Sequence, residues 1–237
     1  MLTLETALER QGAYRAHSSE RARLHDTDLI AFVGGAAVGK NYLMQKSGLY
    51  VCGTETSRAP RESDSAAKYT YSSNNEMLAA IEAGELIQYG VHLPDTIYGS
   101  RVRDYQVGEP NASDIWFDAV SALENKGFRT VKAVSILSPP VQWYQQLEER
   151  FEDRPTAFII DRLNETRHSV RWSVAQHLSC AANHLLIIND SAHTSESIDR
   201  IQAFAANETV DPLDDADVSR ARDEMSRVID HYLGKLR

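Results

Sequence analysis

A glycine-rich segment that ends in lysine carries the clearest chemistry of this sequence. Residues 29–40 read Leu-Ile-Ala-Phe-Val-Gly-Gly-Ala-Ala-Val-Gly-Lys, so Gly34, Gly39 and Lys40 have the spacing of a phosphate-binding loop. Glycines let the backbone curl until several N–H groups point at one anion, and the lysine can reach the outer phosphates of a nucleotide. The apolar run before the loop predicts a buried parallel strand, and the residues after it predict a helix. The predicted phosphate-binding segment is Gly34, Gly35, Ala36, Ala37, Val38, Gly39, Lys40 and Asn41.

The residue after the lysine departs from the usual pattern of such loops. Ser or Thr normally stands there and binds Mg²⁺ through its hydroxyl, whereas this sequence has Asn41. An amide oxygen can also bind Mg²⁺, so Asn41 is a candidate metal ligand. The alternative to a nucleotide site is a glycine turn that binds nothing.

A pair of arginines further along the chain could bind a second phosphate group. Arg58 and Arg61 stand on either side of Pro60, and proline restricts the backbone so that both guanidinium groups can be directed at one anion. Arginine binds phosphate through two parallel hydrogen bonds. Tyr69 and Tyr71 follow on a predicted strand with both rings on one side. The alternative is a solvated charged loop beside half-buried sheet residues.

Predicted strands alternate with predicted helices through the rest of the chain. We expect strands at residues 29–33, 49–54, 68–72, 86–91, 96–98, 115–120, 130–137 and 185–188. We expect helices at residues 74–84, 141–152, 157–179, 195–206 and 218–236, and a surface helix over residues 3–24 that is broken near Gly12. This order predicts an α/β fold, a P-loop NTPase-type parallel sheet flanked by helices, with ligands at the carboxyl ends of the strands.

Composition limits the classes of function. The chain has 237 residues, 42% hydrophobic and 25% charged, and a net charge of −9, which argues against a general nucleic-acid binder. Cys52 and Cys180 are too few for a disulfide framework or a zinc site. The first residues lack the pattern of a signal peptide, and no apolar run is long enough to cross a membrane. We therefore expect a cytoplasmic protein with no membrane partner.

The order of the motifs resembles the guanylate kinase family. The resemblance extends over about residues 28–206. The motifs that carry it are the loop 34–40, Thr54-Glu-Thr-Ser-Arg-Ala-Pro-Arg61, Tyr69–Tyr71, Gly84-Glu-Leu-Ile-Gln88, Tyr98-Gly-Ser100, Pro139-Pro140, Arg162-Leu163 and Leu186-Ile-Ile-Asn-Asp190.

The resemblance implies a domain plan and an activity. The plan is an N-terminal helical extension (1–27), a guanylate kinase-like domain (28–208) and a C-terminal helix (209–237). Within the central domain it implies a β-rich part that binds the nucleoside monophosphate (about 54–112) and a helical lid (about 141–170). The implied activity is ATP-dependent phosphorylation of a nucleoside monophosphate, GMP or dGMP, with Mg²⁺.

The resemblance also implies roles for single residues. Lys40, Arg150 and Arg162 would act on the transferring phosphoryl group, Asn189 would lie near the adenine of ATP, and Asp118 with Asn41 would orient Mg²⁺. The implied acceptor-nucleotide residues are Thr54, Arg58, Arg61, Asp64, Tyr69, Gln88, Tyr98, Ser100 and Asp118.

Departures from the family pattern keep other functions open. Gln88 replaces a glutamate that would accept hydrogen bonds from guanine, Gln146 replaces a lid arginine, and Asn41 replaces the Mg²⁺-binding hydroxyl. One alternative is therefore a kinase for a different nucleoside monophosphate. Another is a catalytically inactive binding module. The sequence leaves monomer and homodimer open, because the apolar stripe of residues 218–236 could pack on the core or on a second copy.

Overall fold

The computed structural model describes residues 2–60, 68–92 and 95–236. By internal contacts the chain forms two compact units. The first unit comprises Met1–Leu29, Tyr50–Ser113 and Asp118–Val131, and the second comprises Ile30–Leu49, Asp114–Phe117 and Lys132–Arg237.

A five-stranded parallel sheet has β1 (Asp28–Gly34) as its central strand, as the buried apolar run predicts. The strand order is β2-β7-β1-β8-β9, with β2 at Tyr50–Val51, β7 at Pro110–Asp114, β8 at Thr130–Leu137 and β9 at His184–Ile188. In such a sheet the carboxyl ends of β7, β1 and β8 meet at one edge, where ligands gather. The predicted α/β architecture is confirmed.

A second, mixed sheet belongs to the first unit and has the strand order β4-β3-β6-β5. Its strands are β3 (Thr54–Thr56), β4 (Tyr69–Tyr71), β5 (Gln88–His92) and β6 (Thr96–Ser100). The pair β3–β4 is parallel, whereas β3–β6 and β5–β6 are antiparallel. Helices α1 (Leu4–Arg10) and α4 (Asn74–Glu82) contribute buried side chains to an apolar cluster that also contains Ile97 of β6.

The N-terminal segment is a surface segment with a break near Gly12, as the sequence predicts. It forms α1 and a short α2 (Ser18–Ala22), and most side chains of these two helices are exposed or half-buried. Ala7 and Leu24 are fully buried, and the Tyr14 hydroxyl donates to Leu86 O at 2.8 Å. A few apolar side chains therefore attach the segment to its unit.

Helices of the second unit agree with the sequence prediction within a few residues. They are α3 (Lys40–Lys46), α6 (Pro140–Phe151), α7 (Thr156–Leu178), α8 (Thr194–Ala205) and α9 (Asp215–Lys235). Short elements complete the description: α5 (Val120–Leu123) and the 3₁₀ turns η1 (Val102–Asp104), η2 (Phe117–Ala119) and η3 (Ser191–His193). None of the helices in the described ranges is long and apolar enough to span a membrane.

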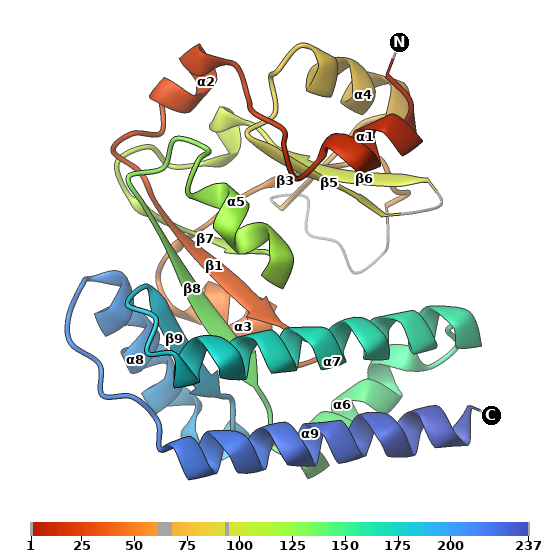
Figure 1. Ribbon diagram of the computed structural model, residues 1–237, viewed down its shortest axis with the longest axis vertical. Helices are drawn as coiled ribbons and strands as arrows, with labels where there is room; N and C mark the ends of the chain where they lie inside the picture. The colour runs from red at the N-terminus through yellow and green to blue at the C-terminus, as the bar shows by residue number, and fades with distance from the viewer. Residues whose placement is uncertain (1, 61–67, 93–94, 237) are drawn as a thin grey trace. The chain divides into compact units, whose positions relative to one another are not determined.

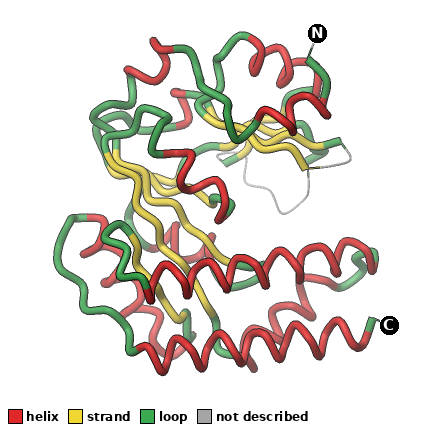
Figure 2. The backbone as a smooth tube through the Cα atoms, in the orientation of Figure 1, coloured by secondary structure: helices red, strands yellow, loops and turns green. Residues whose placement is uncertain are grey.

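An aromatic cluster joins α9 to α6. Tyr232 is 7% exposed, and its ring lies 5.8 Å from that of Tyr144 and 5.9 Å from that of Phe151. Arg167 of α7 donates to Asp230 at 2.6 Å, so α9 is bound to α7 as well. Figures 1 and 2 show these helices side by side. The apolar stripe of the last helix therefore packs within its own unit.

Two strand predictions were wrong. The apolar run Ile115–Val120 is not a strand, because β7 ends at Asp114 and the chain then turns into η2. The expected strand 49–54 is divided into β2 and β3, which belong to different sheets.

Truncation of Tyr232 to Ala should lower the free energy of unfolding by about 3 kcal/mol, because it empties the cluster between α9 and α6. Urea denaturation measures the loss. The matched control is Val141→Ala on α6, where the side chain is 72% exposed and the expected change is within about 0.5 kcal/mol. Equal losses in the two variants would contradict the packing described.

Stability should also depend on the ionisation of His184. Burial, with a smaller effect of His177, lowers the pKa of His184 from 6.5 to about 4. Between these values the unfolded chain binds a proton that the folded chain does not, so the free energy of unfolding falls as the pH falls. His184→Gln should lose less stability between pH 7 and pH 5 than the parent chain in urea denaturation. His168→Gln, at an exposed position of α7, should behave like the parent.

Candidate functional site

The glycine-rich loop lies directly between β1 and α3. Gly39 has φ +91° and Ala37 has φ +60°, so the backbone makes left-handed turns at both positions before the helix begins at Lys40. A Cβ on Gly39 would overlap the side-chain amide of Asn189. The chain thus passes from strand through a turn into a helix, and phosphate binding by this loop stays a prediction.

Donors outside the loop hold its carbonyl oxygens. The indole Nε1 of Trp143 donates to Ala36 O at 2.8 Å, and the amide Nδ2 of Asn189 donates to Val38 O at 2.9 Å. A trans peptide is planar, so the N–H of the following residue points away from each of these carbonyl oxygens. Both following N–H groups are therefore directed away from Trp143 and Asn189, as an anion-binding loop requires.

Lys40 lies against the start of the loop. Its Nζ donates to Gly34 O at 2.7 Å and to Gly35 O at 2.8 Å, and it lies 3.9 Å from Asp114 Oδ1. The lysine side chain is 14% exposed, whereas that of Asp114 is 45% exposed. An ammonium and a carboxylate thus stand together beside the loop.

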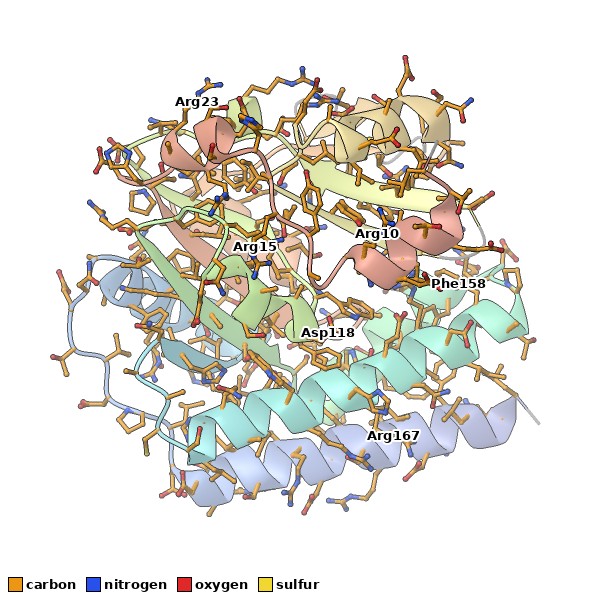
Figure 3. All side chains as sticks on the ribbon, turned by 45° about the horizontal axis from the view of Figure 1, so that its top comes forward. Arg10, Arg15, Arg23, Asp118, Phe158 and Arg167 are labelled. Carbon is orange, nitrogen blue, oxygen red and sulfur yellow. The ribbon has the colours of Figure 1, made fainter. Side chains whose placement is uncertain are left out.

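Asp114 is a candidate that the sequence analysis missed. It ends β7, the neighbour of β1, and the backbone N–H of Ile115 continues the pairing by donating to Phe32 O at 3.0 Å. The sequence favours Asp118 instead, because its pattern predicts a strand at residues 115–120. The structure places Asp118 in η2, in the first unit, past the end of β7 (Figure 3).

Thr166 of α7 closes one side of the loop. Its Oγ1 accepts a hydrogen bond from Ala36 N at 3.2 Å and donates to Arg162 O at 2.8 Å. A Cβ on Gly35 would overlap the Thr166 methyl group. The second glycine of the loop is therefore required by close packing against α7. No sequence motif marks Thr166, because it lies on a separate helix.

The two predicted catalytic arginines occupy different surroundings. Arg162 donates to Glu165 at 2.8 Å on the same helix, and its guanidinium lies 5.3 Å from the ring centre of Phe158. Burial raises the pKa of Glu165, although the neighbouring Arg162 opposes the shift. Arg150 is exposed in the last turn of α6. Their action on a phosphoryl group stays a prediction.

Asn189 follows β9 and is 6% exposed. Its amide Nδ2 donates to Val38 O, so Asn189 is a positioning residue for the loop. The predicted contact with adenine stays a prediction.

One face of the second sheet brings together the predicted acceptor residues. Residues directly opposite each other in adjacent strands have side chains on the same face, and alternate residues of one strand share a face. Thr54 pairs with Tyr69, and Gln88 pairs with Ser100. Tyr98 is two residues from Ser100 and pairs with Thr56, which is two residues from Thr54. The acceptor face, as we call it, consists of Thr54, Thr56, Tyr69, Tyr71, Gln88, Tyr98 and Ser100.

Arg58 lies over two tyrosines of the acceptor face. Its guanidinium carbon is 4.6 Å from the ring centre of Tyr69 and 5.7 Å from that of Tyr71, and Nη1 donates to Ala59 O at 2.9 Å. Stacking on aromatic rings holds a guanidinium in one plane. Arg61 and Asp64 lie outside the described residues.

A buried phenol contacts the acceptor face. The hydroxyl of Tyr105 is 2.6 Å from Ser100 Oγ. Burial raises the pKa of Tyr105, and the hydrogen bond with Ser100 only partly opposes this, so the phenol stays protonated. The sequence analysis missed Tyr105, which follows η1 and touches the face only through the fold.

The other face of this sheet contains a buried carboxylate. Glu55 accepts hydrogen bonds from Arg101 Nε at 2.6 Å, Ser72 Oγ at 2.8 Å and Arg103 at 3.2 Å. Burial by itself would raise the pKa of Glu55, but these hydrogen bonds and charges outweigh it and hold the pKa below its ordinary value. Glu55 therefore ties β3 to the segment after β6.

The described residues contain no cluster of three or more His, Cys, Asp or Glu side chains that could hold a metal ion by themselves. Mg²⁺ needs fewer protein ligands than such a cluster supplies. It is often bound by one or two carboxylates and completes its coordination with water and substrate phosphates. Asp114, with a carboxylate next to Lys40, fits this kind of site.

Comparisons with known proteins concern the fold. A scan of the sequence against protein-family models finds no match, and a search of curated proteins finds none. Among solved structures, guanylate kinase from Anaplasma phagocytophilum is similar with a TM-score of 0.52 and 17% sequence identity, over 81% of this chain and 90% of that chain. The chain therefore has a guanylate kinase-like fold.

The packing of Gly35 against Thr166 can be tested by a double-mutant cycle. Gly35→Ala should lower the free energy of unfolding by about 2 kcal/mol, because the new methyl group has no space. In the Thr166→Ala background the same substitution should cost much less. Urea denaturation of the four proteins gives the coupling. The same cost in both backgrounds would show that Thr166 does not confine the loop.

Proposed function

We propose that this protein transfers the terminal phosphoryl group of ATP to the phosphate of a nucleoside monophosphate. The observation that carries the proposal is the loop between β1 and α3, with Lys40 Nζ on its carbonyl oxygens and 3.9 Å from Asp114. The guanylate kinase-like fold supports the same reaction class. GMP and dGMP are the first acceptors to test, because the resemblance of the motifs favours them.

The donor nucleotide would bind to the second unit. The inward N–H groups of the loop and the N-terminus of α3 attract the phosphate chain. Lys40 would exchange its loop carbonyls for phosphate oxygens, and its charge would follow the negative charge that builds up during transfer. Phosphoryl transfer depends mainly on alignment and charge neutralisation, so these groups supply what the protein must provide.

Asp114 and the amide oxygen of Asn41 are the residues that would hold Mg²⁺ together with phosphate oxygens. When bound, the ion would neutralise charge on the phosphates. Asp114 also faces the ammonium of Lys40, so its carboxylate would keep the lysine directed at the loop. We propose Asp114 in place of Asp118 for this role, because Asp114 ends the strand beside β1.

The acceptor would bind to the acceptor face of the first unit. Arg58, stacked on Tyr69, offers a planar pair of donors for the acceptor phosphate. Tyr98 presents its hydroxyl from the same face, and Gln88 and Ser100 offer polar groups for the base. An acceptor phosphate oxygen is already a nucleophile, so no general base is required. Arg150 and Arg162 would stabilise the transferring group from α6 and α7.

Lys40→Met should lower kcat at least 100-fold, because one charge that stabilises the transition state is lost. A coupled assay with MgATP and GMP measures the effect. The matched control is Lys46→Met, at an exposed position of the same helix, which should keep the parent rate. A Lys40→Met protein with full activity would contradict the proposal.

Arg58→Ala should act on the acceptor alone. We expect the KM for the monophosphate to rise at least tenfold, since a charged hydrogen bond is lost, with an unchanged KM for ATP. Steady-state kinetics with each substrate varied in turn separates the two constants. An effect confined to the KM for ATP would assign Arg58 to the donor instead.

A further inference from the structure

A cavity of about 320 Å³ lies in the second unit, lined by β9, α8 and the segment that joins α8 to α9 (Figure 1). Its wall includes residues 182–186 at the start of β9 and residues 207–210 after α8. This is the amino end of β8 and β9, whereas the glycine-rich loop follows the carboxyl end of β1. The cavity is therefore separate from the proposed nucleotide site. Its volume falls within the range of small-molecule sites, about 300–1,000 Å³.

Two cationic side chains line this cavity, Lys132 of β8 and Arg200 of α8. Lys132 is 6% exposed, and its Nζ donates to Phe204 O and lies 4.9 Å from the centre of the Phe204 ring. Arg200 Nη2 donates to Asp211 O at 2.7 Å. A carbonyl oxygen has no net charge, so these two hydrogen bonds fix the cations in place without neutralising them.

Arg200 also has an unsatisfied donor. Its Nε is buried, and no residue that the structure describes accepts a hydrogen bond from it. The carboxylates of Asp190 and Glu196 line a smaller cavity that Arg200 also borders, but neither forms an ion pair with it. A half-buried charge whose described partner is a neutral oxygen is unfavourable, because it has lost part of its hydration. An anion in the larger cavity would compensate this charge.

The other ionisable side chains of the wall leave positive charge in excess. Burial lowers the pKa of His184 to about 4, so this ring is neutral near pH 7. His177 Nε2 lies 3.2 Å from Asp215 Oδ1, which compensates a proton on that ring. Glu208 adds one negative charge against the two cations, and it is exposed. The wall therefore favours an anion, although the chain as a whole has a net charge of −9.

We propose that this cavity is a second ligand site, which binds the phosphate or carboxylate group of a small organic anion through Lys132 and Arg200. A guanidinium forms strong hydrogen bonds with either group, and a buried ammonium adds charge. Val210, Pro212 and Leu213 line the same cavity and provide apolar surface for the remainder of the ligand. The site is independent of the proposed function, since none of these residues belongs to the glycine-rich loop or to the acceptor face.

NMR of the full chain with inorganic phosphate as the probe tests the site. The side-chain amides of Asn183 and Asn207 line the cavity and serve as reporters. Titration with phosphate at constant ionic strength should shift both resonances along a saturable curve, because the anion occupies one site beside them. Acetate is the second probe. Tighter binding of phosphate assigns a phosphorylated ligand, and tighter binding of acetate assigns a carboxylate.

Variants of the two cations separate binding from general charge. Arg200→Gln and Lys132→Met should each weaken the binding of the preferred probe about tenfold, because a charged hydrogen bond is lost. Arg200→Lys keeps the charge and should lose less than Arg200→Gln. The matched control is Arg220→Gln on α9, where the side chain is 62% exposed and binding should equal that of the parent. Thermal denaturation checks that each variant is folded.

Three results would overturn the second site. The first is the absence of a saturable shift at Asn183 and Asn207 with either probe. The second is equal binding by the parent and by folded Arg200→Gln and Lys132→Met proteins. The third is a phosphate response at the Gly39 N–H alone, because the anion would then bind only the glycine-rich loop.

Discussion

The direction of the peptide groups in the loop between β1 and α3 is the constraint on which the proposed nucleotide site depends. Carbonyl oxygens compete with phosphate for the same space, so they must be held elsewhere if the N–H groups are to meet an anion. Trp143 and Asn189 hold two of them from α6 and from the end of β9, and Thr166 of α7 packs against Gly35. The loop is therefore shaped by three separate parts of the second unit, and Gly35 and Gly39 are required by this packing.

The same principle governs the acceptor face, where the fold fixes polar groups before a ligand arrives. Arg58 is stacked on Tyr69, and Ser100 is hydrogen-bonded to a buried phenol. Side chains that are already ordered lose less entropy when they bind a ligand. In the second unit, hydrogen bonds to carbonyl oxygens orient the backbone of the loop. In the first unit, aromatic and phenol partners hold the side chains.

Local signals in the sequence account for what could be predicted. The loop, the long helices and the buried strands each follow from residue spacing within a single stretch of sequence. Their predicted bounds agree with the observed bounds to within a few residues. Strand β7 was missed because Pro110–Asp114 has little strand propensity and is ordered by its neighbours; Asn111, for example, is fully buried and bonded to the backbone of Gln106. The apolar run that follows, residues 115–120, has the stronger strand pattern. The sequence therefore indicates Asp118, whereas the aspartate at the end of the strand is Asp114.

Residues that act on the site from another element could not be inferred from spacing. Thr166 and Tyr105 each reach the site only through tertiary packing, and neither lies in a recognisable motif. The residues of the acceptor face are different, because local motifs mark them. The motifs that resemble guanylate kinase imply Thr54, Tyr69, Gln88, Tyr98 and Ser100, and the strand register places all five on one face.

Amide resonances of the loop test the proposed nucleotide site most directly. On addition of millimolar MgATP, the Gly39 N–H should move downfield as it bonds to phosphate, while the N–H of Gly90 in β5 stays in place. A Gly39 resonance that does not move at saturating MgATP would contradict the claim that this loop binds nucleotide phosphates.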